Sequence, residues 1–136
     1  DVRIKDDTWL VPWGFALAVT VEHFTIPRNV LGVVHDKSTL ARRGISMFNT
    51  YIDPGFQGFL TLEISNRRWR PIMFLAGQPI AQIVLYFTDR PVSRPYAGKY
   101  QHAAHTPQPA ILERRGCDGQ LPWQYLRAQD DPSNPR

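Results

Sequence analysis

The chain has 136 residues, of which 43% are apolar and 12% aromatic. This composition supports one domain with one hydrophobic core and excludes a chain that is disordered throughout. A formal charge of +4 and a pI near 9.6 favour anionic ligands. The basic residues form no long run and no repeated basic-aromatic stripe, which fits a small phosphorylated ligand better than a nucleic-acid track. We therefore expect no nucleic-acid partner.

The cellular location can be predicted from the membrane-spanning, export and disulfide signals that the sequence lacks. No apolar run approaches the roughly 18 residues needed to cross a bilayer, and the start DVRIKDD has no apolar signal core. The single cysteine, Cys117, excludes an intrachain disulfide framework and favours a reducing compartment. We expect a cytoplasmic protein, or one of the host cytoplasm if a phage encodes it, with no membrane partner.

Taken in chain order, the elements are short strands separated by turns, which predicts an all-β fold. Strands are predicted over 15–21, 30–34, 45–52, 59–64, 71–75 and 80–88. The one helix is predicted over Ser38 to Arg43, with Ser38 or Thr39 capping its start and Gly44 ending it. Many short strands with closing turns predict a barrel or a jelly-roll-like sandwich.

The character of the chain changes near Asp89, where prolines begin to recur and the apolar alternation fades. We expect residues 1–105 to form one domain that includes an extended C-terminal arm. Residues 106–136 are expected to be a loosely ordered, proline-rich tail.

A cationic group at the predicted helix start is the first candidate for chemistry. Lys37, Ser38, Thr39 and Arg42 combine hydroxyls, free backbone N–H groups and positive charge, which together can hold a phosphate. Taken alone, the same residues are also common on the surface around any short helix. These residues indicate a phosphate site only in combination with the neighbouring motifs.

Two carboxylates follow at a spacing of ten positions. Glu63 lies in a predicted strand on the face opposite Leu62, so it is either a solvent-facing glutamate or a general base that lines a pocket. Asp53 precedes Pro54 and Gly55, which makes a turn without any catalytic purpose, or alternatively an acceptor for a sugar hydroxyl. Both could face one cavity across a hairpin.

The zinc-dependent nucleobase deaminases require a His-x-Glu and a Pro-Cys-x-x-Cys motif. With one cysteine, and histidines only at 23, 35, 102 and 105, the chain cannot supply them. Any deamination by this sequence must proceed without zinc.

Five ordered segments resemble the dCTP deaminase family of the dUTPase-like superfamily, and most closely a phage and bacterial subgroup with a DKST-x-ARRG motif. They are KSTLARRG, IDPGFQG, LTLEISN, GQPIAQ and PYAGKYQ. The resemblance implies a distorted β-barrel or jelly-roll subunit that forms a homotrimer with shared active sites. It implies dCTP as substrate, with dUTP as the other possibility, and Mg²⁺ bound through the triphosphate.

The resemblance also implies a role for individual residues. Glu63 and Asp53 are expected to be catalytic, with Asp53 at the deoxyribose. The expected substrate-binding set is Lys37, Ser38, Thr39, Leu40, Ala41 and Arg42 at the triphosphate, Thr61, Leu62 and Glu63 at the base, and Gln82, Tyr96 and Lys99 completing the site.

The chain departs from the commoner family pattern in several places. The link from Asn49 to Asp53 is about two residues shorter, in the hairpin that selects the base. Lys37 replaces an arginine and loses its bidentate fork, and Ala103 stands where the arm often has glutamine. The start DVRI resembles an internal family segment, so we expect an upstream stretch to be absent.

The leading hypothesis is hydrolytic deamination of dCTP to dUTP with Glu63 as general base. Its alternatives are a dUTPase, in which Asp53 positions water against the α-phosphate, and a bifunctional enzyme that forms dUMP. A third class is a catalytically silent homologue that binds a nucleotide or a protein, with a jelly-roll assembly protein as its extreme.

Overall fold

The computed structural model describes residues 1–112. The predictions for Cys117 and for most of the tail over 106–136 lie outside the described residues. In chain order the elements are β1 (Val2–Arg3), β2 (Thr8–Leu10), β3 (Phe15–Thr25), β4 (Val30–Asp36), α1 (Ser38–Ala41), β5 (Ile45–Met47), β6 (Tyr51–Ile52), β7 (Gln57–Asn66), β8 (Ile72–Phe74) and β9 (Pro79–Phe87).

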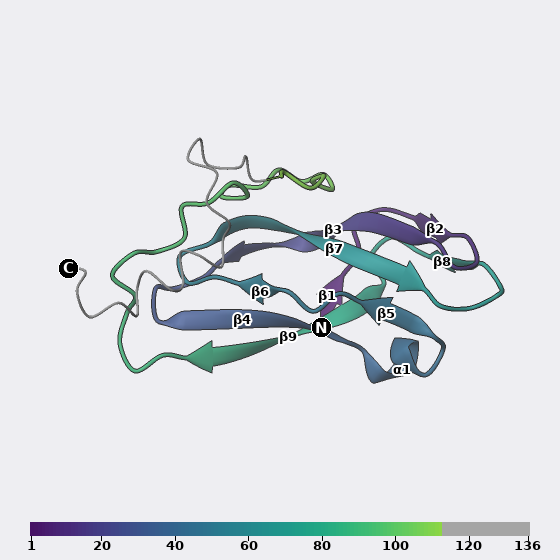
Figure 1. Ribbon diagram of the computed structural model, residues 1–136, viewed down its shortest axis with the longest axis horizontal. Coiled ribbons are helices and arrows are strands. Elements are labelled where there is room, and N and C mark those ends of the chain that lie inside the picture. Colours follow the sequence, from purple (N-terminus) through teal and green to yellow (C-terminus); the bar gives the residue numbers. More distant parts are fainter. Residues whose placement is uncertain (113–136) are drawn as a thin grey trace, which may run out of the picture.

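The strands form a two-layered β sandwich, as predicted (Figure 1). One sheet has the order β3-β7-β5 and the other β1-β9-β4-β6, with the short pair β2-β8 at one end. All named strand pairs are antiparallel. The core between the layers is aliphatic and aromatic, and its fully buried side chains include Ile4, Leu10, Leu62, Ile64, Phe74 and Ile80.

Strand β7 positions the candidate base. Its side chains alternate, so Leu62 and Ile64 are buried in the core while Thr61 and Glu63 point to the other face of the sheet. In the neighbouring β3, the register against β7 shifts between Val19 and His23. The alternation predicted for β7 is confirmed, and it places Glu63 outside the core.

The single short helix is confirmed, but its predicted cap is wrong. Lys37 occupies the N-cap position with extended backbone, and no side chain caps the helix. The helix makes only one turn, and the Lys37 carbonyl accepts from the N–H groups of Leu40 and Ala41, each at 2.9 Å. Gly44 ends the segment as predicted, with a φ of 74° that favours glycine.

The predicted strand over 45–52 is two strands. Residues 48–50 leave the sheet between β5, which pairs with β7, and β6, which pairs with β4. The chain therefore crosses from one layer of the sandwich to the other at this point. This crossing brings the turn at Asp53 beside the open face of β7.

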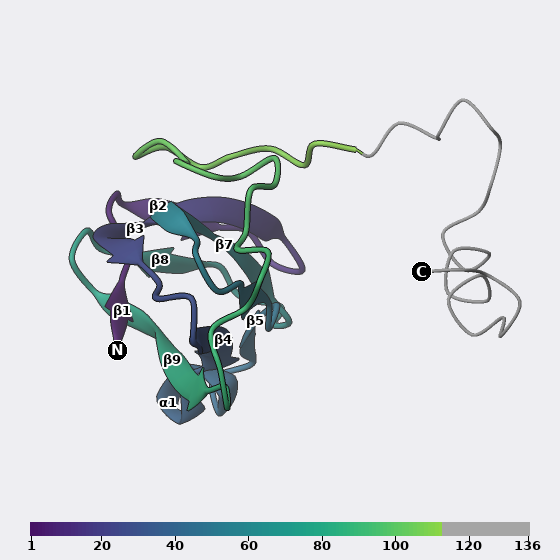
Figure 2. The same cartoon turned by 90° about the vertical axis from the view of Figure 1, so that its left-hand side faces the viewer.

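After β9 the chain becomes an arm without regular structure that passes over β3 and β7 (Figure 2). One isolated bridge joins Ala103 to Gly58, the second residue of β7. Within residues 1–112 no helix is long and apolar enough to cross a membrane.

Candidate active site

A cavity of about 430 Å³ lies between β7, the 50–56 segment and the arm. Its wall is mostly apolar and aromatic, with two carboxylates and several hydroxyl groups. The lining residues are Phe15, Leu17, Thr50, Tyr51, Ile52, Asp53, Phe56, Phe59, Leu60, Thr61, Glu63, Tyr96, Tyr100, Ala103, Gln108 and Ala110.

Glu63 is the half-buried carboxylate of this cavity. Leu17 lies directly opposite Glu63 in the β3-β7 register. The N–H of Phe48 donates to the Glu63 carbonyl at 3.1 Å. Burial raises the pKa of the Glu63 carboxyl, and a hydrogen bond from its own backbone lowers it by less. No ion pair with another described residue holds the charge. A carboxylate in such surroundings is suited to accept a proton.

Asp53 lines the same cavity from the turn before β7. The N–H of Phe56 donates to the Asp53 carbonyl at 3.1 Å, and the N–H of Gly55 donates to Ile26 at 3.0 Å, which closes the turn. Gly55 has a φ of 91°, and a Cβ added there would lie 2.5 Å from Pro95. The turn therefore needs glycine both for its backbone and for the arm that lies against it.

The arm forms one wall of the cavity. The N–H of Tyr96 donates to the Pro54 carbonyl at 2.8 Å, and the Tyr96 ring packs against Phe56. Gln101 accepts from the N–H of Gln57 at 2.9 Å and donates to the Gly55 carbonyl at 3.0 Å. These contacts hold the first part of the arm to the turn and to the start of β7.

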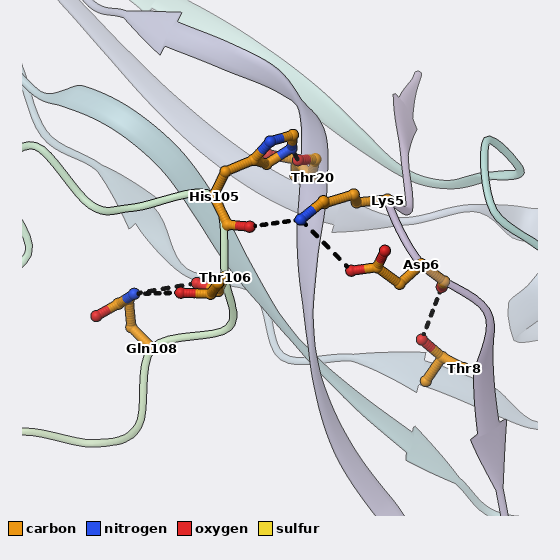
Figure 3. A network of polar contacts seen from close by, with 7 residues as sticks. All are labelled: Lys5, Asp6, Thr8, Thr20, His105, Thr106 and Gln108. Carbon is orange, nitrogen blue, oxygen red and sulfur yellow. Dashed lines mark hydrogen bonds and ion pairs between the residues drawn. The ribbon is translucent and has the colours of Figure 1, made fainter.

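The second part of the arm is fixed by His105 and Gln108 (Figure 3). The His105 ring stacks on Phe59 at 3.8 Å between centroids, and its Nε2 contacts the Thr20 carbonyl at 3.1 Å. Lys5 donates to the His105 carbonyl at 2.7 Å. The N–H of Gln108 donates to the Thr61 hydroxyl at 2.9 Å, two residues from Glu63. The arm thus reaches the part of β7 that carries the carboxylate.

The predicted cationic group lies elsewhere on the chain. Lys37 makes an ion pair with Asp1 at 2.5 Å, and Gln82 donates to the same carboxylate at 3.4 Å. None of the residues that line the cavity is a lysine or an arginine. The structure therefore separates the predicted site into a carboxylate half and a cationic half.

Of the predicted residues, the structure brings Asp53, Thr61, Glu63 and Tyr96 together in the cavity. The side chains of Leu40 and Leu62 are buried in the core and can offer only their backbone. The other predicted binding residues, Lys37, Ser38, Thr39, Ala41, Arg42, Gln82 and Lys99, do not line it.

Sequence reasoning missed most of the wall. Leu17, Phe59, Tyr100 and Gln108 line the cavity but were not predicted as site residues. Phe59 had a visible signal, since it shares a strand face with Glu63. The others depend on the β3-β7 register and on the path of the arm, which no local pattern reveals.

Comparison with solved structures defines the class of fold. A dUTPase of EIAV matches with a TM-score of 0.59 at 22% identity, covering 73% of this chain and 82% of that one. A variant dUTPase of Staphylococcus bacteriophage 80alpha, solved with dUpNHpp, matches with a TM-score of 0.61 at 17% identity, covering 72% and 85%. A variant dUTPase from phage phi11 of S. aureus, described with a structural Mg(II) ion, also reaches 0.61 at 17% identity over 72% and 82%. The chain has a dUTPase-like fold.

Sequence comparison gives the family. Residues 1–88 match the model of the dCTP deaminase-like family, and the chain belongs to that family. A dCTP deaminase of Nitratiruptor sp. is 44% identical over 115 residues, which are 82% of this chain and 62% of the relative. A dUMP-forming dCTP deaminase of Methanoculleus marisnigri is 39% identical over 113 residues, 82% and 60% respectively. The chain thus spans only about three fifths of the length of these relatives.

Proposed function

We propose that this protein deaminates dCTP hydrolytically to dUTP, with Glu63 as the general base. The observation that carries the proposal is the Glu63 carboxylate itself, half-buried in a largely apolar cavity that it shares with Asp53 and Thr61. Membership of the dCTP deaminase-like family supports the same reaction. The deaminase relatives are longer than this chain, so their activity enters here as a proposal.

The chemistry follows from the protonation of Glu63. The ionised carboxylate takes a proton from water, and the resulting hydroxide forms a bond to the ring carbon that bears the amino group. Addition converts the ring C=N bond to a single bond, and the carboxyl passes the first proton to that ring nitrogen. The carboxylate then takes the proton of the new hydroxyl group and delivers it to the amino nitrogen, so that the C–N bond breaks and ammonia leaves as the carbonyl forms. One water is consumed, and the carboxylate is regenerated. Asp53 binds the deoxyribose, while Thr61 and the backbone of Leu62 position the base.

The triphosphate requires cations that this cavity lacks. We assign them to Lys37, Ser38, Thr39 and Arg42 of a neighbouring copy in a homotrimer, with Leu40 and Ala41 contributing backbone. Gln82 joins this cationic half, because it lies with Lys37 at the Asp1 carboxylate. Tyr96 and Lys99 act from the arm that covers the site.

Magnesium would accompany the triphosphate. Residues 1–112 contain no group of three or more acidic, histidine or cysteine side chains suited to hold a metal ion. Mg²⁺ retains several waters and is commonly held by substrate phosphates, so phosphate oxygens would supply its ligands here. Its chemistry would be to neutralise charge on the triphosphate.

We place the activity in the cytoplasm, or in the host cytoplasm if the chain is phage-encoded.

The alternative is cleavage of the triphosphate, either as a dUTPase or in a dUMP-forming bifunctional enzyme. It is favoured by Asp53, which shares the cavity with Glu63 and could position a second water against the α-phosphate. A relative at 39% identity is named a dUMP-forming dCTP deaminase. A silent homologue that only binds a nucleotide is the remaining alternative.

The test compares the wild-type chain, a Glu63→Gln variant and a matched Glu22→Gln control. Glu22 pairs with Arg3 at 2.8 Å and does not line the cavity. Each protein is incubated with dCTP or dUTP and Mg²⁺, and ammonia, pyrophosphate and nucleotides are quantified. We expect Glu63→Gln to lose about 10²- to 10⁴-fold in ammonia release and the control to retain it.

Each other outcome supports a different function. Ammonia release that survives Glu63→Gln contradicts the proposed base. Pyrophosphate from dUTP without deamination selects the dUTPase, both products from dCTP select the bifunctional enzyme, and nucleotide binding without product selects the silent homologue.

A further inference from the structure

Three segments far apart in sequence meet at one end of the molecule. They are the turn between β2 and β3, the C-terminal end of α1 and the loop between β7 and β8, at the right-hand end of Figure 1. The N–H of Arg67 donates to the Gly44 carbonyl at 2.8 Å, and the N–H of Trp13 donates to the Arg68 carbonyl at 3.2 Å. A Cβ added at Gly44 would lie 2.9 Å from the Arg68 side chain, which therefore lies over this glycine.

A buried asparagine holds these segments in place. Asn66 is fully buried, and its amide nitrogen donates to the Val11 carbonyl at 3.0 Å and to the Arg70 carbonyl at 2.9 Å. Its amide oxygen accepts from the N–H of Arg68 at 3.0 Å. The loop that carries the arginines is thus fixed to the turn that carries Trp13.

The resulting arginine–tryptophan surface consists of Trp13, Arg43, Arg67, Arg68, Trp69 and Arg70. None of its four guanidinium groups makes an ion pair with a residue of the described part of the chain. Arg70 lies over the Trp69 ring at 4.2 Å from its centroid. Four positive charges carried by adjoining segments, without an acidic partner among residues 1–112, favour an anionic ligand.

The tryptophans point to the chemistry of that partner. Trp13 and Trp69 are each 70% exposed, which is unusual for the largest apolar side chain. Trp13 also has a φ of 58°, a left-handed conformation that is unfavourable for a bulky side chain. Trp13 lies within a turn closed by the N–H of Gly14, which donates to the Val11 carbonyl at 3.0 Å, and a strained residue that also exposes its ring is a candidate for a binding role.

We propose that the arginine–tryptophan surface binds single-stranded nucleic acid. Guanidinium groups beside exposed aromatic rings suit the phosphates and the unstacked bases of a single strand. Guanidinium groups bind phosphate in bidentate geometry and also stack on bases. A duplex covers the faces of its bases, and a lipid surface would require apolar groups gathered into one continuous face.

None of the residues of this surface lines the cavity, and none belongs to the group assigned to the triphosphate, which ends at Arg42, one residue before Arg43. The sequence-based expectation of no nucleic-acid partner rested on basic residues scattered along the chain. Folding gathers four of them, from two segments more than twenty residues apart, around exposed tryptophans.

The test is fluorescence anisotropy of a labelled oligo-dT of about 20 nucleotides, titrated with the full chain at roughly 50 to 200 mM NaCl. The variants are Arg67→Gln combined with Arg70→Gln, and Trp69→Ala, all at exposed positions. Arg90→Gln is the matched control, since this side chain is 84% exposed and lies outside the surface. Circular dichroism confirms that each variant is folded.

We expect the wild type to bind with a salt dependence of about −0.7 in log–log slope for each phosphate contacted. The double arginine variant then flattens the slope by about 1.4. Trp69→Ala weakens binding about fivefold or more, and quenching of tryptophan fluorescence by the oligonucleotide is lost in part. Arg90→Gln binds as wild type, and saturating dCTP does not displace the oligonucleotide.

Four outcomes overturn the proposal. They are absence of binding at roughly 50 mM salt, equal loss in the Arg90→Gln control, displacement by dCTP, and binding of phosphatidylserine vesicles without binding of oligo-dT. None of these readouts measures ammonia or pyrophosphate, so failure here leaves the proposed deamination untouched.

Discussion

If each active site combines two copies of the chain, two inactive variants should restore activity when they are mixed. The first variant, Glu63→Gln, loses the carboxylate half, and the second, Arg42→Ala, loses a guanidinium from the cationic half. The structural basis is that Glu63 lines a cavity with no lysine or arginine in its wall, while Arg42 lies on the C-terminal side of α1 outside that wall. Each variant alone removes one half of every site.

The expected activity of the mixture follows from the fraction of sites that contain both an intact carboxylate half and an intact cationic half. In a ring assembled at random from equal amounts of both variants, a complete site needs an intact Glu63 on one copy and an intact Arg42 on the adjacent copy. Each condition is met with a probability of about one half, so about one quarter of the sites are complete. Both variants change exposed or half-buried polar side chains, so neither should prevent folding.

The assay is ammonia release from dCTP by the two variants, co-expressed or unfolded and refolded together. The mixture should reach about one quarter of the wild-type rate per chain. Each variant refolded alone gives the background. Wild type refolded with a variant that carries both changes reports how far the copies exchange, because about one quarter of the sites are complete if they mix and about one half if they do not. A mixture no more active than the sum of its separate components would show that each site lies within one chain. The inference that two copies supply the carboxylate half and the cationic half would then be wrong.

Three further predictions concern stability and the arm. Asn66→Ala should lower the free energy of unfolding by about 3 kcal/mol, since it removes three good buried hydrogen bonds of about 1 kcal/mol each, and urea denaturation with an unchanged m-value checks this. Glu63→Gln should raise the Tm at pH 8, because burial raises the pKa of Glu63 and so disfavours its ionised form in the folded state. That gain should shrink as the pH falls through the raised pKa towards the unfolded value of 4.5, and an equal gain at pH 4 and pH 8 contradicts the assignment. Gly58→Ala should detach the arm and destabilise the chain by about 1–3 kcal/mol, because φ is 142° and the new Cβ would lie 2.6 Å from the Ala103 nitrogen; limited proteolysis of the arm measures this.

The parts of the site that could be predicted are those governed by local pattern. The two-residue period of β7 placed Thr61 and Glu63 on the face away from Leu62, and the Asp53-Pro54-Gly55 turn followed from residue chemistry. The cap of α1 was mispredicted because hydroxyl residues only permit capping, and the chain enters this one-turn helix with Lys37 at the N-cap.

The rest depended on contacts between distant residues. That Leu17 faces Glu63 depends on the β3-β7 register, which shifts at a bulge with no clear sequence signature. That Gln108 reaches Thr61 depends on the path of an arm without regular structure. The break at 48–50 is set by the change of layer between β5 and β6, which an apolar run cannot reveal.

The division of the site fits the proposed role of Glu63 as a base. A guanidinium in the same cavity would attract the carboxylate and lower its pKa, which would weaken it as a proton acceptor. Because Lys37 and Arg42 lie outside the cavity wall, burial is the largest influence on the Glu63 carboxyl in the single chain and raises its pKa, while the hydrogen bond from its own backbone lowers it by less. In the proposed homotrimer, the cations of a neighbouring copy would meet the triphosphate, whose negative charge would balance theirs.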